Sequence, residues 1–264
     1  MRLHAVDPGT TPHTSELNGI RVLVTGATSG LGAAMAAAHA DAGARVMVTG
    51  RDHAQAEATA SRLGSSVVAC ELDVRDERSV AACVARACDA WGGVDMLVNN
   101  AGIGMRTVNP RFLSEPQPFW EVTPAGFRDV VATKLGGCFL MAREVVPLML
   151  RQGAGRVVNI SMNEGTMVRR GFAPYGPTGA GVEALSRVMA ADLAETPVTV
   201  NILLPGGQGT RTGMVPDDAP AEVQARLLDP SVMGPPIVWL ASAEAAGVHD
   251  QRFVASGFRA GSID

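Results

Sequence analysis

Thr25-Gly26-Ala27-Thr28-Ser29-Gly30-Leu31-Gly32 (TGATSGLG) is the stretch of sequence that decides the fold. It follows a short β-branched run, residues 20–25, and opens an Ala- and Met-rich segment, residues 31–42, with a helix former at nearly every position. A glycine turn between a strand and a helix lets the backbone turn tightly and aims helix N-terminal amides at a pyrophosphate. The alternative is an ordinary strand-to-helix turn. Its position at the first such junction favours a dinucleotide site.

Short apolar runs alternate with helical segments along the rest of the chain. Further strands are predicted at residues 45–49, 66–70, 94–98, 155–160, 198–204 and 252–255. Helices are predicted at residues 54–63, 78–91, 124–151, 174–194, 219–228 and 236–241. Because helical segments between strands imply right-handed crossovers, the strands should pair in parallel. The sequence therefore predicts an α/β fold, a doubly wound parallel sheet with helices on both faces (Rossmann-like), as a single domain of residues 18–264 after a flexible arm of residues 1–17.

The composition argues against several classes of partner. The 264 residues carry a formal net charge of only -4 with no Lys- or Arg-rich run, so no footprint for nucleic acid or for an anionic membrane surface is present. Every apolar stretch is interrupted well before the ~18 to 20 residues that span a bilayer. The four cysteines show no CxxC or CxxH spacing and follow no secretory leader. They predict buried thiols in a reduced, cytoplasmic compartment and no metal site; they are Cys70, Cys83, Cys88 and Cys138.

Three further motifs follow the glycine turn along the chain. They are Leu72-Asp73-Val74, Asn99-Asn100-Ala101-Gly102, and Pro205-Gly206 with Thr210 five residues after the proline. Each alone could be a strand-end turn. Together with the glycine spacing of TGATSGLG they resemble the short-chain dehydrogenase/reductase family, and the resemblance runs from about residue 17 to the C-terminus.

The resemblance implies a role for each motif. Asp73 is expected to contact the adenine of a dinucleotide, the Asn-Asn-Ala-Gly motif to support the sheet beside the adenosine ribose, and the Pro-Gly motif with its threonine to hold the nicotinamide carboxamide. The predicted cofactor-binding residues are Gly26, Thr28, Ser29, Gly30, Leu31, Gly32, Arg51, Asp73, Val74, Asn100, Ala101, Gly102, Pro205, Gly206 and Thr210.

The choice of dinucleotide depends on the end of the second predicted strand. An acidic residue there would accept hydrogen bonds from a free ribose, whereas an arginine would pair with a 2'-phosphate. This chain has Gly50-Arg51, which predicts NADP(H) in preference to NAD(H). The alternative is a solvated arginine paired with Asp52.

The resemblance also implies a catalytic set of Ser, Tyr, Lys and Asn, from which this chain departs. Tyr175, the only tyrosine, lies at the tyrosine position and is the expected proton donor or acceptor; the alternative is a core tyrosine with a satisfied hydroxyl. The lysine position holds Gly179, the serine position Met162, and the asparagine position Lys134. Without a cation nearby, a phenol of pKa ~10 is a poor base at neutral pH, whereas carbonyl reduction asks only for an acid.

Two hypotheses address the missing groups. Lys134 could send its ammonium into the space left by Gly179 and restore the cation beside Tyr175; alternatively it reaches solvent. Ser161 or Asn163 could donate to a substrate carbonyl in place of Met162, and strand alternation predicts both on the side opposite Met162.

The substrate pocket is expected between two irregular segments. One is residues 103–122, with Phe119 and Trp120, and the other is residues 207–230, with Met214 and Val215. The loop that carries Met167, Arg169, Arg170 and Phe172 could line the same cleft, and its arginines could receive an acidic substrate or stay solvated.

The sequence thus predicts an NADP(H)-dependent oxidoreductase that transfers hydride between the cofactor and a small carbonyl or alcohol. The rival prediction is a nucleotide-binding protein that has lost catalysis and acts as a sensor or assembly subunit. An isomerase or hydrolase is disfavoured because no metal cluster or nucleophile–base set stands out. The resemblance implies a homodimer or homotetramer formed through helices 124–151 and 174–194.

Overall fold

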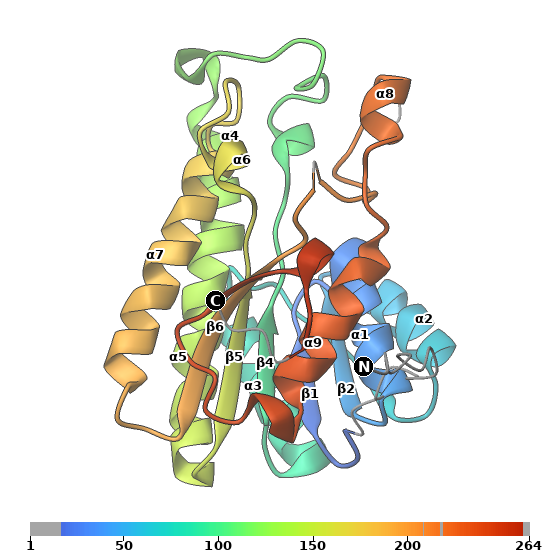
Figure 1. The fold of residues 1–264 in the computed structure, drawn as a ribbon, viewed down its shortest axis with the longest axis vertical. Helices are drawn as coiled ribbons and strands as arrows, with labels where there is room; N and C mark the ends of the chain where they lie inside the picture. Colours follow the sequence, from blue (N-terminus) through green and yellow to red (C-terminus); the bar gives the residue numbers. More distant parts are fainter. Residues whose placement is uncertain (1–16, 208, 217–218, 261–264) are drawn as a thin grey trace, which may run out of the picture.

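A seven-stranded parallel sheet forms the centre of the molecule. The computed structural model describes residues 17–207, 209–216 and 219–260. The strand order is β3-β2-β1-β4-β5-β6-β7 (Figure 1). The order reverses between β1 and β4, where doubly wound sheets open a crevice at their carboxyl ends. The predicted fold class is therefore confirmed, with strands β1 (Arg21–Val24), β2 (Arg45–Gly50), β3 (Val67–Glu71), β4 (Met96–Asn99), β5 (Gly155–Ile160), β6 (Val198–Leu204) and β7 (Arg252–Val254).

Helices cover both faces of the sheet because alternate strand residues point to opposite sides. Val22 and Val24 pack under α1 (Gly30–Asp41), α2 (His53–Leu63) and α9 (Gly234–Ala241). Leu23 packs under α3 (Glu77–Trp91), α5 (Gly137–Gln152) and α7 (Tyr175–Leu193). Figure 1 shows α1 and α9 on one side of the sheet and α5 and α7 on the other. The parallel strands are thus buried on both faces, as near-continuous apolar runs require.

The irregular elements differ from the prediction. The predicted helix 124–151 is α4 (Pro124–Val131), a π-helical turn (Ala132–Gly136) and α5. Such turns often occur at functional sites, and this one carries Lys134. The predicted helix 219–228 is wrong in length, since only α8 (Ala221–Gln224) forms, and the short α6 (Glu164–Met167) was not predicted.

The predicted N-terminal arm lies outside the described residues except for its last member. Leu17 is fully buried, and its amide donates to the carbonyl of Ala42. Ordered structure therefore includes Leu17, one residue before the predicted domain boundary.

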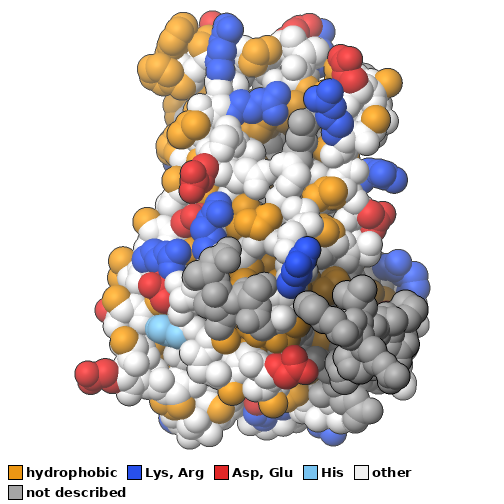
Figure 2. Space-filling model, in the orientation of Figure 1, with side chains coloured by type: hydrophobic (Ala, Val, Ile, Leu, Met, Phe, Trp, Pro, Cys, Tyr) orange, Lys and Arg blue, Asp and Glu red, His pale blue; other side chains and the backbone are white. Residues whose placement is uncertain are grey.

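The described surface carries no long apolar helix. None of the described helices is long and apolar enough to cross a membrane. On the face shown in Figure 2, basic and acidic side chains are interspersed, with no large patch of one sign.

Cys70, Cys83 and Cys138 are buried, as predicted, and Cys88 is half-buried.

His39 makes the fold sensitive to acid. It lies fully buried in α1, and burial lowers its pKa from 6.5 to about 4. The unfolded chain therefore binds a proton at His39 that the folded chain does not, and stability falls as pH falls from about 6.5 through about 4. A shift of this size corresponds to about 3 kcal/mol.

We expect His39→Leu to remove much of this acid sensitivity. Urea unfolding at pH 7.5 and at pH near 4.5 should give a smaller difference in unfolding free energy for the variant than for the parent chain, because leucine binds no proton. His53→Gln, at an exposed ion-paired histidine, is the matched control and should keep the parent's pH dependence. Equal slopes for His39→Leu and the parent would contradict the assignment.

Candidate active site

A cavity of about 800 Å³ opens at the carboxyl end of the sheet. It brings together residues from the glycine turn, the ends of β2 to β6 and the start of α7. Every predicted cofactor-binding residue except Gly32 lines this cavity: Gly26, Thr28, Ser29, Gly30, Leu31, Arg51, Asp73, Val74, Asn100, Ala101, Gly102, Pro205, Gly206 and Thr210. Residues up to 184 positions apart in sequence thus line one cavity.

Only glycine fits at Gly26, in the turn before α1, and at Gly32, in the first turn of α1. Gly26 has φ +61°, and a Cβ there would lie 2.9 Å from Cα of Ala101. A Cβ at Gly32 would meet the carbonyl oxygen of Gly26. The chain therefore folds back tightly on itself and presents the N-terminus of α1 to the cavity, a geometry suited to an anionic phosphate group.

Asn100 and Thr25 hold this turn against β4. The Asn100 amide Nδ2 donates to the carbonyls of Thr25 and Gly26, both at 2.9 Å. The Thr25 hydroxyl accepts from the backbone amides of Asn100 and Ala101 at 2.9 and 3.0 Å. The Asn-Asn-Ala-Gly motif thus supports the glycine turn directly. The sequence analysis assigned no role to Thr25. The signal that could have identified it is its position directly after β1.

Beside the glycine turn, Arg51 and Asp73 follow the ends of the neighbouring strands β2 and β3. Asp73 accepts three side-chain hydrogen bonds from Arg75, which hold the pKa of its carboxyl below the ordinary value, with a smaller contribution from Arg51. Asp52 accepts from the Gln55 amide at the start of α2. Within the described ranges no ion pair engages Arg51, so its guanidinium is exposed at the rim of the cavity.

Tyr175 is the first residue of α7 and lies half-buried in the cavity wall. Its ring packs on a cluster of Met105, Phe112 and Phe172, and its hydroxyl lies 3.8 Å from Sδ of Met214. Burial raises the pKa of the Tyr175 phenol. The group therefore keeps its proton at neutral pH and is suited to donate it.

Lys134 is buried beside this tyrosine, not in solvent. Its ammonium lies 5.9 Å from the centre of the Tyr175 ring and donates to the carbonyl of Ile160 at 3.1 Å. The π turn places it there. Burial lowers the pKa of Lys134 from 10.5 to about 8. A cation thus lies near Tyr175, as hypothesised.

The Lys134 ammonium, however, does not occupy the space beside Gly179. A Cβ at Gly179 would lie 2.6 Å from Cε and 2.8 Å from Sδ of Met162. Met162 is buried and fills the notch that the glycine leaves. Met162 and Gly179 are therefore in contact, and the absence of a side chain at position 179 leaves room for the thioether.

Ser161 and Asn163 both use their polar side chains within the protein. The Ser161 hydroxyl donates to Oε1 of Glu183 at 2.6 Å, and the Asn163 amide donates to the carbonyl of Gly207 at 2.7 Å. Ser161 and Met162 both contact α7, so the expected alternation does not hold, because β5 ends at Ile160. Both residues still line the cavity, as does Asn163.

Part of the cavity wall is apolar. Met105, Phe112, Phe172, Met214 and Val215 line it. The expectation for Phe119 and Trp120 is not met, since both side chains are 72% exposed and neither lines the cavity. Of the two arginines, Arg169 lines the cavity and stacks 4.7 Å from the centre of the Phe172 ring.

The fold and the cavity define a class of protein: a Rossmann-like α/β protein with a glycine turn and a half-buried tyrosine in one cavity. Comparison with known proteins gives the family. A family model described as short chain dehydrogenase matches residues 21–221. The chain belongs to the short-chain dehydrogenase/reductase family.

Relatives with described activities match most of the chain. It is 33% identical over 247 residues to the 3-oxoacyl-[acyl-carrier-protein] reductase FabG of Vibrio cholerae, a match that covers 91% of this chain and 97% of that protein. It is 32% identical over 185 residues to the NADP-dependent 3-hydroxy acid dehydrogenase YdfG of Salmonella typhi, covering 70% and 71%. The crystal structure of the 3-ketoacyl-(acyl-carrier-protein) reductase from Brucella melitensis, complexed with NADH, has a TM-score of 0.81 at 30% identity and covers 90% of this chain and 97% of its own.

Proposed function

We propose that this oxidoreductase reduces a small carbonyl substrate with NADPH, or oxidises the corresponding alcohol, and that Tyr175 exchanges the proton. The observation that carries the proposal is the position of the Tyr175 hydroxyl in the same cavity as the glycine turn. The glycine cradle fits a dinucleotide because a Cβ at Gly26 or Gly32 would close it. When bound, the nicotinamide supplies or accepts the hydride.

The first test separates binding from catalysis. We expect NADPH to raise the melting temperature, since a ligand of the folded state stabilises it by mass action, and to be consumed over a panel of uncharged and acidic carbonyl compounds. Stabilisation without consumption of NADPH favours the rival function, a nucleotide-binding sensor or assembly subunit. That rival has one specific observation in its favour: Met162 and Gly179 supply neither a hydroxyl nor a cation.

Lys134 is proposed to assist Tyr175 through its charge. Proton donation leaves a phenolate, and an ammonium 5.9 Å from the ring stabilises that phenolate by about 3 kcal/mol at an effective dielectric of ~20. Ser161 and Asn163 remain the proposed donors to a substrate carbonyl. Either must exchange its present partner, Glu183 or the Gly207 carbonyl, to do so.

The role of Lys134 predicts a pH dependence of carbonyl reduction. Because its pKa is about 8, the ammonium is present below that pH and lost above it, so the reduction rate should fall by up to about 100-fold as pH rises through this range. Stopped-flow or steady-state rates between pH 6 and pH 10 would measure this. Lys134→Met should be slow throughout and lack the break. A break of the same size in Lys134→Met would assign it to another group.

Arg51 is proposed to select NADP(H), and replacement by aspartate tests this. The 2'-phosphate would lose a bidentate donor and meet a carboxylate, so we expect Arg51→Asp to weaken NADPH relative to NADH by about 2 kcal/mol or more, roughly 30-fold. Calorimetric Kd values for both nucleotides give this ratio. YdfG is NADP-dependent and the Brucella structure holds NADH, so relatives use both. Unchanged relative affinities would exclude Arg51 from this role.

Assembly is also proposed from the exposed faces of the helix pair. Phe127 on α4, Phe139 on α5 and Val188 on α7 are 45%, 48% and 56% exposed. Such exposure fits burial in a homodimer or homotetramer through these helices. Light scattering after gel filtration would measure the mass. The cytoplasmic localisation stays a prediction.

A further inference from the structure

One face of α7 carries the site and continues beyond it. Tyr175, Gly179 and Glu183 lie four residues apart and therefore share one face of the helix. The two residues that follow β5 lie along this face, with Met162 against Gly179 and Ser161 bonded to Glu183. The contacts that place the end of β5 against α7 therefore lie one and two helical turns from Tyr175.

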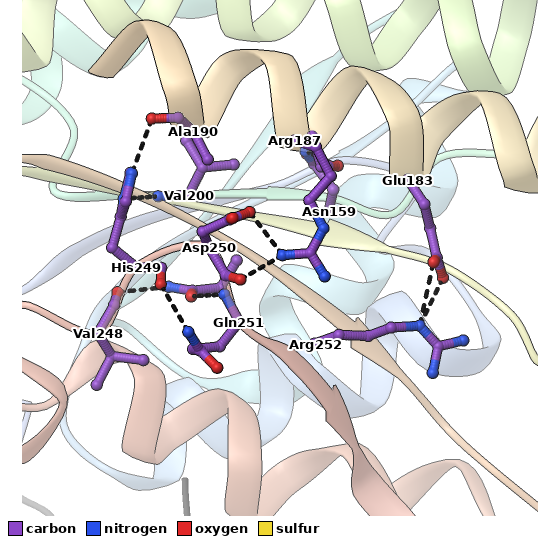
Figure 3. Close-up of polar contacts among 12 residues, drawn as sticks. Asn159, Glu183, Arg187, Ala190, Val200, Val248, His249, Asp250, Gln251 and Arg252 are labelled. Atoms are coloured by element: carbon purple, nitrogen blue, oxygen red, sulfur yellow. Dashed lines mark hydrogen bonds and ion pairs between the residues drawn. The ribbon is translucent and has the colours of Figure 1, made fainter. Parts of the chain in front are cut away.

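Arg252 of β7 completes this arrangement. Its Nε donates to both carboxylate oxygens of Glu183 at 3.0 and 3.1 Å, as Figure 3 shows. Its Nη2 donates to the carbonyl of Met162 at 3.2 Å. Both side chains are largely buried, with 24% of Arg252 and 19% of Glu183 exposed. One carboxylate therefore fixes two consecutive residues, Ser161 directly and Met162 through the arginine.

We propose that Glu183 and Arg252 are a positioning pair that holds the Met162 thioether in the Gly179 notch and so keeps water away from Tyr175. The Met162 peptide is fixed by Arg252 on one side and by the Ser161 bond on the other, which leaves the side chain aimed at the notch. Among the described hydrogen bonds and ion pairs, neither member of the pair contacts Tyr175, and Met162, which lines the same cavity as Tyr175, is the proposed link to the phenol. The expected effect on kcat rests on the proposed function, whereas the expected effect on the Tyr175 titration does not.

Three other residues near Tyr175 could also change the pKa of its phenol. Lys134 on the π turn faces its ring, and Arg169 stacks on the neighbouring Phe172. Met214 contacts the hydroxyl from the segment after β6. None of these residues is bonded to Glu183 or Arg252, so a change at the pair can be separated from a change at these groups.

The single tyrosine of the chain allows a direct test. Protein labelled with [13C-ζ]tyrosine gives one ring resonance, and the midpoint of its pH titration reports the pKa of the Tyr175 phenol. We expect Arg252→Gln to lower the pKa of Tyr175 by about one unit toward its ordinary value, because water enters beside the ring. The same variant should change kcat more than KM for the carbonyl, since the proton donor is altered while the apolar pocket remains.

Arg187→Gln is the matched control. Arg187 lies one turn after Glu183 and pairs with Asp250 at 2.6 Å, so it joins the same helix to the segment before β7 (Figure 3). It does not touch residues 161 or 162. We expect it to leave the Tyr175 titration and the kinetic constants unchanged. An equal shift in both arginine variants would overturn the proposal, because the cause would then be general loosening of α7.

A double variant tests the route through Met162. In a Met162→Ala background the notch is already open, so Arg252→Gln should produce no further change in the Tyr175 titration. A further shift of similar size would overturn the route. If Arg252→Gln does not fold, Arg252→Lys, which keeps the charge but not the second arm to Met162, is expected to shift the titration in the same direction. Shifted resonances in a protein that turns over no carbonyl would support the positioning pair and reject the proposed function.

Discussion

Tyr175→Phe is expected to slow turnover by about 10²- to 10⁴-fold while leaving nucleotide binding intact. The phenylalanine keeps the ring in its cluster of Met105, Phe112 and Phe172, so the fold and the cavity should persist. It removes the hydroxyl that is proposed to exchange a proton with the substrate. Loss of a general acid typically costs about 10²- to 10⁴-fold in rate, and we expect kcat to fall within this range at unchanged NADPH affinity.

The measurement pairs initial rates of NADPH oxidation with a calorimetric Kd for NADPH. An unchanged melting temperature serves as the control for folding. A Tyr175→Phe variant that turns over within about threefold of the parent, a change of less than 1 kcal/mol, would show that the proton comes from elsewhere. Water held by Lys134 would then be the group to examine.

Replacing Gly179 by lysine is expected to lower the stability of the parent chain but to raise activity in a Met162→Ser background. In the parent chain the new Cβ would lie 2.6 Å from Cε of Met162. Such overpacking typically costs about 1 to 3 kcal/mol, so Gly179→Lys alone should lower the melting temperature and not improve activity. With Met162→Ser the notch is open, and the double variant carries both a hydroxyl and a cation beside Tyr175.

The double variant is expected to reduce carbonyls faster than the parent. Removal of one such electrostatic stabiliser elsewhere costs about 2.7 to 4 kcal/mol, so a gain of up to about 100-fold in kcat is the corresponding expectation. A thermodynamic cycle over the two single variants and the double variant should also give a favourable coupling free energy of stability. Additive stabilities would contradict the contact between Met162 and Gly179.

The fold could be predicted from sequence because its signals are local. The TGATSGLG turn, the β-branched runs and the helix formers lie within single windows of the chain, and the observed strands follow them closely. The π turn at Lys134 could not be predicted, since residues 124–151 read as one uninterrupted helix. Local propensity does not encode such a turn, because tertiary context can override it.

The site was predicted as a set of residues but not as a set of contacts. The cavity does gather the motif residues, and Lys134 does lie beside Tyr175. The filling of the Gly179 notch by Met162 depends on two residues 17 positions apart, and the pair of Glu183 and Arg252 on residues 69 apart. Pairings over such distances follow from the arrangement of β5, α7 and β7, and the sequence offered only a departure from a pattern at two of these positions.

Transfer of deuterium from NADPH labelled at C4 of the nicotinamide tests the central claim most directly. Mass spectrometry of the product from a reactive carbonyl should show one deuterium on the carbinol carbon with the parent chain, and Tyr175→Phe should form this labelled product about 10²- to 10⁴-fold more slowly at equal nucleotide saturation. A chain that binds the labelled cofactor tightly and yet labels no product from any carbonyl would contradict the account.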